Sequence, residues 1–95
     1  MNRNYKEIFR PLVDEINQLL GRPAQMFASS VEESPLVWNI GHIFIDKNSS
    51  GYLLEEIVGP TGATRSLTYR MSGRDMDIAL RSIISGISLR NSSTE

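Results

Sequence analysis

The chain has 95 residues, of which 40% are hydrophobic and 22% charged, and its formal net charge is -1 at pH 7. This length fits a single domain over residues 1–95, and the near-neutral charge excludes a general attraction to nucleic acid or anionic membranes. The chain has no cysteine, which excludes disulfides, thiolate nucleophiles and cysteine-ligated metals. Its N-terminal stretch is charged and no segment approaches the roughly 20 apolar residues of a membrane span, so we expect a cytoplasmic protein without membrane association.

The first predicted element is an amphipathic helix over residues 4–20. Its apolar residues recur at spacings of three and four and therefore fall on one stripe; they are Tyr5, Ile8, Phe9, Leu12, Val13, Ile16, Leu19 and Leu20. Gly21, with Pro23 beyond it, is a typical helix ending. Pro11 lacks the amide N–H that would bond to the carbonyl of Glu7, so we expect either a kink there or a helix that begins at Pro11.

A connection and a long strand are predicted next. Residues 22–34 lack a clear period, although residues 24–29 allow a short edge strand. Residues 36–46, LVWNIGHIFID, carry β-branched and aromatic side chains on both alternate sets, which predicts a central strand. One set contains Val37, Ile43 and Ile45, and the other contains Trp38, Ile40 and Phe44.

Two more strands and a second helix complete the chain. The strands are predicted over residues 52–58 and over residues 67–71, where apolar and polar residues alternate. Ser72, with Asp75 three residues later, indicates the start of a helix. The stripe of this helix consists of Met76, Ala79, Leu80, Ile83, Ile84 and Ile87. We expect a disordered tail over about residues 90–95.

Together these elements predict an α+β fold with the order αβββα. Three successive strands joined by short turns pair as an antiparallel meander, and two amphipathic helices can both pack on one face of it. The expected architecture is therefore a two-layer sandwich.

The loop that begins at Asp46 has two interpretations. Asp46, Asn48, Ser50 and Gly51 occupy the first, third, fifth and sixth places of a calcium-binding loop. The twelfth place, however, is Ile57, where such a loop needs a glutamate with two ligating oxygens. A hairpin turn, in which Gly51 adopts a positive φ, explains the same residues without a metal. We therefore predict no metal site.

His42 is the only histidine, and without cysteines or further histidines it cannot complete a common zinc site. We interpret it as a structural residue whose ring is satisfied by a neighbour. A register that pairs residues 42 and 55 would place it opposite Glu55.

Two surfaces are candidates for binding. Two helices can cover only one side of the first strand, so the set Val37, Ile43 and Ile45 is predicted as an interaction surface, with a second copy of the chain as the economical occupant. Arg65, Arg70 and Arg74 gather around the third strand and the start of the last helix, and they form a candidate patch for an anion or nucleic acid.

Two resemblances bear on function. The order αβββα is that of the double-stranded RNA-binding domain, but the last helix opens with the acidic SGRDMD and the chain lacks that family's Gly-Pro-x-His motif. Residues 51–80 resemble a pattern of small accessory proteins of bacteriophages and prophages. The matching residues are Tyr52, Leu54, Gly62, Arg65, Leu67, Arg70, Met71, Ser72, Arg74 and Asp75. This resemblance implies a mobile-element origin more than a mechanism.

The sequence therefore predicts a small non-catalytic protein-interaction module. Its expected partner is another protein or a second copy of itself, as a homodimer, and no cofactor is expected. The alternative is a nucleic-acid-binding domain that uses the arginine patch.

Overall fold

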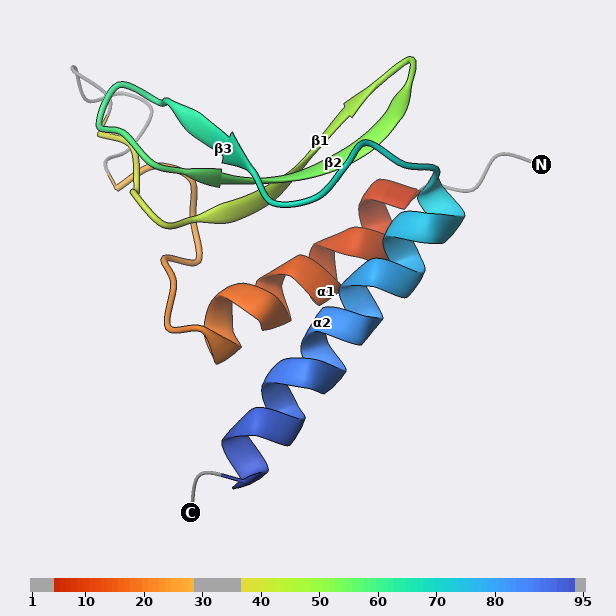
Figure 1. Ribbon diagram of the computed structural model, residues 1–95. Coiled ribbons are helices and arrows are strands. Elements are labelled where there is room, and N and C mark those ends of the chain that lie inside the picture. The colour runs from red at the N-terminus through yellow and green to blue at the C-terminus, as the bar shows by residue number, and fades with distance from the viewer. Residues whose placement is uncertain (1–4, 29–36, 94–95) are drawn as a thin grey trace.

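The computed structural model describes residues 5–28 and 37–93. Its elements follow the order α1 (Tyr5–Leu19), β1 (Ile43–Asn48), β2 (Gly51–Ile57), β3 (Thr64–Ser66) and α2 (Gly73–Ser93). The strands form one antiparallel sheet in the order β1-β2-β3, and both helices lie on the same side of it (Figure 1). The predicted α+β fold with the order αβββα is confirmed.

Helix α1 forms as its sequence predicts and ends at the expected glycine. It begins at Tyr5 and continues through Pro11, so the alternative in which the helix starts at Pro11 is wrong. At its end Gly21 has a φ of 66°, and the amides of Gly21 and Arg22 donate to the carbonyls of Gln18 and Asn17 at 3.1 and 2.7 Å. This pair of bonds satisfies the last carbonyls of the helix, as a glycine in the left-handed region allows.

Strand β1 starts later than predicted. The chain turns at Ile40 and at Gly41, whose φ is 98°, and a residue in that conformation cannot continue an extended strand. Before the turn, Trp38 forms only an isolated bridge with Phe27, and their rings lie 4.5 Å apart. The predicted strand over residues 36–46 is therefore wrong in its first half. The suggested edge strand at residues 24–29 is represented, among the described residues, only by the bridge between Phe27 and Trp38. Residues 29–36 lie outside the described part of the chain.

Strand β3 is shorter than predicted and lies before the expected place. It spans Thr64–Ser66 rather than residues 67–71, and the hydroxyl of Thr68 takes over as the acceptor for the amide of Leu54 at 3.2 Å. The backbone rejoins the sheet only at Met71, which exchanges bonds of 2.7 and 2.8 Å with Tyr52. Leu67 still donates to the carbonyl of Leu54 at 2.8 Å. Tyr69, which alternates with Leu67 and Met71, is 91% exposed, because residues 68–70 lie outside the strand.

Helix α2 begins as predicted and runs further than predicted. The hydroxyl of Ser72 accepts a bond from the amide of Asp75 at 3.1 Å, which caps the helix. The helix continues to Ser93, so residues 90–93, expected in a disordered tail, have helical backbone. Its last turns extend beyond the edge of the sheet (Figure 1).

The core lies between the sheet and the two helices. Its buried members are Phe9, Val13, Ile16, Ile43, Leu54, Met76 and Leu80. Side chains as buried as Met76 and Leu80, both 0% exposed, each contribute about 1.5–3 kcal/mol to folding. The helices of this small domain are thus held mainly by one apolar cluster.

The predicted interaction surface was expected on the side of the strand that the helices leave uncovered, and for Ile43 and Ile45 this placement is wrong. Ile43 is 3% exposed and Ile45 packs against the core cluster, because the helices cover the face to which both belong. Val37 is 50% exposed, but it precedes the turn at Gly41 and is not part of the sheet. Both alternate sets of the strand sequence are apolar, so the sequence did not show which set the helices cover. The packing of the helices in the structure shows that they cover the set that contains Ile43 and Ile45.

Candidate functional site

The outer edge of β1 is the most distinctive polar feature of the fold. β1 is an edge strand, with β2 on one side only. At its first residue, Asn17 of α1 donates from Nδ2 to the carbonyl of Ile43 and accepts on Oδ1 from the amide of Ile43, both at 2.9 Å. Asn17 is only 1% exposed. Its side-chain amide therefore pairs with Ile43 as the backbone of a neighbouring strand would.

The next outward positions of this edge, Ile45 and Lys47, have no such partner among the residues that the structure describes. In the register of the sheet, Leu54 and Tyr52 lie opposite Ile45 and Lys47. Their amides and carbonyls point away from β1 and bond to residues 67, 68 and 71 on the other side of β2. Since alternate residues of an antiparallel strand bond to opposite sides, the backbone groups of Ile45 and Lys47 point outward, as those of Ile43 do. Within residues 5–28 and 37–93 no hydrogen bond to these outward groups is found. We call Ile45 and Lys47 the free edge.

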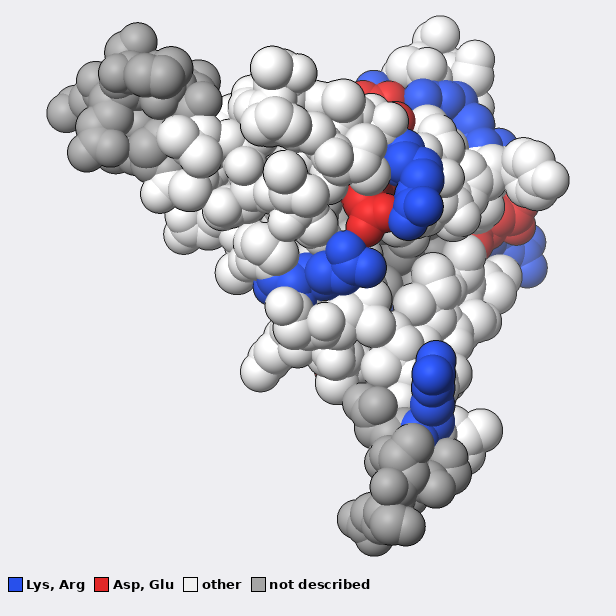
Figure 2. Space-filling view, turned by 60° about the vertical axis from the view of Figure 1, so that its left-hand side comes forward, with Lys and Arg blue, Asp and Glu red and all other residues white. Residues whose placement is uncertain are grey.

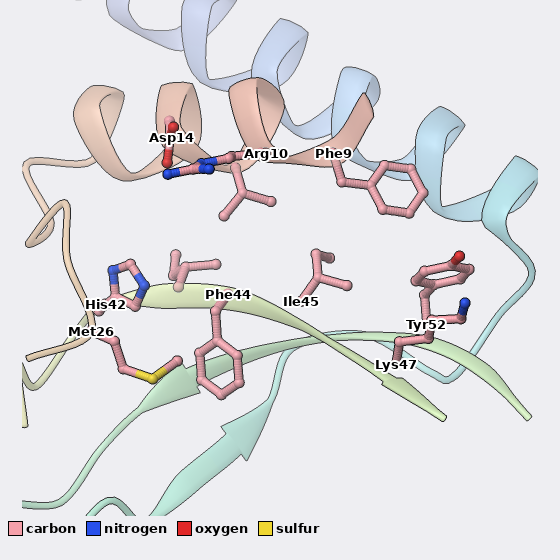
Figure 3. A pocket seen from close by; sticks show the side chains of 11 residues that line it. Phe9, Arg10, Asp14, Met26, His42, Phe44, Ile45, Lys47 and Tyr52 are labelled. Carbon is pink, nitrogen blue, oxygen red and sulfur yellow. The ribbon is translucent and has the colours of Figure 1, made fainter. Parts of the chain in front are cut away.

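A groove lies along the free edge, between α1 and β1. It has a volume of about 540 Å³, and Figure 3 shows side chains from α1 and from the sheet facing each other across it. Its apolar lining consists of Phe9, Val13, Met26, Ile43, Ile45 and Tyr52, and His42 and Phe44 also contribute. This volume lies within the range of sites that bury small ligands or peptide side chains.

The walls of the groove are set by packing between its two sides. The rings of Phe9 and Tyr52 are perpendicular, with centroids 5.1 Å apart, which is a favourable aromatic arrangement. The ammonium of Lys47 lies 5.7 Å from the centroid of the Tyr52 ring, close enough for a cation–π interaction. Tyr52 thus links α1 to the free edge and fixes this end of the groove.

Three charged side chains line the groove. Arg10 and Asp14 come from α1 and Lys47 comes from β1 (Figure 3), and all three residues are exposed. Among the described residues, none of the three forms a salt bridge. Two cations and one carboxylate give this lining a net positive charge.

Two of the three arginines predicted as a patch, Arg65 and Arg70, form ion pairs within the fold. Arg65 bonds to Glu56, which also binds Arg22 at 2.7 Å. Glu56 is 3% exposed, and a carboxylate at such a position needs these partners because burial of an unpaired charge is costly. The first predicted arginine therefore balances a buried acid.

The other two predicted arginines differ in their surroundings. Arg70 binds the carboxylate of Asp46 and the carbonyl of Gly51, at 2.9 and 3.0 Å. Arg74 is exposed at the start of α2. On the face in Figure 2 the blue basic side chains form separate groups, and several lie against red acidic ones.

The hairpin interpretation of the loop at Asp46 is confirmed. The side chain of Asn48 accepts from the amide of Ser50 at 2.8 Å, and Gly51 has a φ of 125°. A Cβ at position 51 would lie 2.4 Å from the carbonyl oxygen of Met71, so this close approach of two strands requires glycine. No group of three or more metal-binding side chains occurs in the part of the chain that the structure describes.

His42 is held by the backbone, as the structural interpretation predicts. Its Nδ1 lies 2.8 Å from the carbonyl oxygen of Pro23, and the residue is 8% exposed. The suggested register was wrong: Phe44 is opposite Glu55, and the carbonyl of His42 accepts from the amide of Ile57.

The sequence interpretation missed the groove and the residues that make it. One signal was available, because Asn17 lies four residues after Val13 and one after Ile16, on the apolar stripe of α1. A polar residue on a buried stripe needs a hydrogen-bonding partner. Nothing in the sequence, however, indicates that this partner is the edge of a strand.

No protein-family model, curated protein or solved structure matches this chain. Neither described helix has the length and apolar character needed to cross a membrane.

Proposed function

We propose that this chain is a small non-catalytic protein-interaction module that acts in the cytoplasm, and that the groove between α1 and β1 is its binding site. The observation that carries the proposal is the combination of an apolar groove with strand backbone that no described residue pairs. Apolar walls supply burial, and unpaired backbone supplies hydrogen bonds that any polypeptide can complete.

The mobile-element origin stays part of this proposal. Several residues of the phage-like pattern have roles in the fold: Tyr52 pairs with Met71, Ser72 caps α2, and Gly62 would collide with Trp38 if it carried a Cβ. Residues with such roles support a shared architecture. They do not by themselves supply a mechanism.

The nucleic-acid alternative has less support. Arg65 and Arg70 already bind Glu56 and Asp46, so contact with a phosphate would compete with existing ion pairs. A nucleic-acid binder would show affinity that falls steeply as salt is raised. Absence of binding to duplex and single-stranded probes at low salt would eliminate this alternative.

A selection from a random library of linear peptides tests the proposed site. The comparison uses Asp14→Trp, which puts a large side chain into the groove, and Glu15→Trp, which makes the same exposed substitution on a neighbouring position that does not line it. We expect peptides that bind the wild type and Glu15→Trp, and lose at least about tenfold in affinity for Asp14→Trp. Failure to enrich any peptide, or equal binding to both variants, would contradict the proposal.

A further inference from the structure

We propose that the groove binds an extended segment of another protein, which adds to the sheet as a further strand beside β1. The segment would pair with the backbone of Ile45 and Lys47. It would carry apolar residues at alternate positions and a carboxylate near Lys47. This inference rests on the proposed function and specifies its binding mode and the chemistry of its partner.

The pairing of Asn17 with Ile43 is the first argument. One amide group bonds to both the N–H and the C=O of Ile43, each at 2.9 Å, and so completes one rung of an absent strand. The backbone groups of Ile45 and Lys47 point in the same direction, with no bond found to them in the described part of the chain. A polypeptide on this edge would continue the row that Asn17 begins, as in strand addition to an exposed sheet edge.

The position of the groove is the second argument. Residues of a strand alternate between the two faces of the sheet, and Ile43 and Ile45 face the helices. An added strand about 4.8 Å from β1 would direct every second side chain to the same face. Those side chains would enter the groove and contact Phe9, Val13 and Tyr52, which line it.

Charge specifies the segment further. Arg10 and Lys47 line the groove with only Asp14 to balance them, and none of the three has a salt bridge within the described residues. A carboxylate on the incoming segment would lie near two cations. An acidic extended segment is therefore favoured over a basic one.

A second copy of β1 is a poorer occupant than a different chain. In a twofold antiparallel pair of β1 strands centred on Asp46, Ile45 of each copy lies opposite Lys47 of the other. This register therefore uses the outward groups of both residues. The two Asp46 carboxylates would lie directly opposite each other, each already bound to Arg70 of its own chain, so this pairing brings no carboxylate to Lys47 and adds no charge complementarity. Lys47 on the edge also discourages self-pairing.

The test uses the selected peptides with their backbone amides methylated. One synthetic version carries N-methyl groups at one set of alternate residues, and a second carries them at the other set. Only one set of N–H groups can face β1, so we expect at least about a tenfold loss of affinity for one version and less than about threefold for the other. This comparison leaves the protein unchanged and does not depend on the folding of a variant.

The matched protein variants are Lys47→Pro and Lys47→Ala. Both remove the cation, but only proline removes the outward N–H and fills its place with a ring. Peptide affinity should fall at least about tenfold further for Lys47→Pro than for Lys47→Ala, with circular dichroism and thermal unfolding as the check that both variants fold.

The outcomes separate the two proposals. Peptides that are excluded by Asp14→Trp but are insensitive to methylation and to Lys47→Pro would leave the groove as a binding site and overturn strand addition. Failure to select any peptide would overturn both. A concentration-dependent dimer by light scattering, lost in Lys47→Pro and retained in Lys47→Ala, would assign the edge to a second copy and overturn the choice of a different chain.

Discussion

The two ends of the outer edge of β1 differ in whether described residues bond to their outward backbone groups. At Ile43 the side chain of Asn17 completes the backbone hydrogen bonds and is itself buried. At Ile45 and Lys47 the same kind of backbone group faces the groove with no bond found in the described residues. The comparison shows that α1 completes the hydrogen bonds of the strand edge at Ile43, whereas the described residues leave those of Ile45 and Lys47 open.

The largest expected effect is on the free energy of unfolding, and it distinguishes β1 amides that point toward β2 from those that point to the outer edge. The amide of Asp46 points toward Leu53 of β2, so Asp46→Pro should lower the free energy of unfolding by on the order of 3 kcal/mol. The outward amide of Lys47 has no such bond to any described residue, and Lys47→Pro should cost about 1 kcal/mol or less. Urea unfolding measures both, and Asp46→Ala is the control for loss of the Arg70 ion pair. Equal costs would show that the amide of Lys47 has a partner.

The next effect concerns the end of the β1 edge at which Asn17 bonds to Ile43. Asn17→Asp keeps the shape and the acceptor, but its carboxylate cannot donate to the carbonyl of Ile43. We expect a loss of about 2–3 kcal/mol in the free energy of unfolding at neutral pH. Gln18→Glu is the matched control, because the same chemical change at this exposed neighbour should stay within about 0.5 kcal/mol. A neutral result for Asn17→Asp would remove the first half of the comparison.

Hydrogen exchange compares the two ends without any mutation. The amide of Ile43 should exchange at least about tenfold more slowly than those of Ile45 and Lys47, since among the three only Ile43 is buried and bonded to a described residue; tenfold corresponds to about 1.4 kcal/mol. Exchange followed by NMR resolves the three amides. Addition of a selected peptide should slow exchange at Ile45 and Lys47 and leave Ile43 unchanged. Similar protection of all three amides before addition would contradict the free edge.

The smallest expected effect is the contact between Lys47 and Tyr52. Their geometry, 5.7 Å from ammonium to ring centroid, should contribute about 0.5–1 kcal/mol of coupling at this exposed site. A double-mutant cycle with Lys47→Ala and Tyr52→Leu, measured by urea unfolding, isolates this coupling from the packing of Tyr52 on Phe9. Lys47→Arg, which retains the cation, should retain most of the stability. A coupling energy of zero would mean that the contact with the Tyr52 ring does not hold Lys47 in place.

Local signals in the sequence located both helices, the end of α1 and the start of α2. The stripe of α1, the glycine at position 21 and the cap at Ser72 each depend on residues a few positions apart, and the structure has all of them. The turn from Asn48 to Gly51 was recognised for the same reason. The third strand was misplaced because the alternation of residues 67–71 is equally compatible with a bent segment, and here Thr68 takes the place of a ladder residue.

By itself the sequence determined the element order, the two amphipathic helices with their caps, and the hairpin turn, because each follows from contacts within a few residues. Only the tertiary structure decided which face of β1 the helices cover, which acids bind the arginines, and where the described residues leave a strand edge free. An alternating pattern is the same for either face of a strand, and the partners Asn17 and Ile43 are separated by 26 residues. Such pairings depend on how the packed layers meet, and no local period records that.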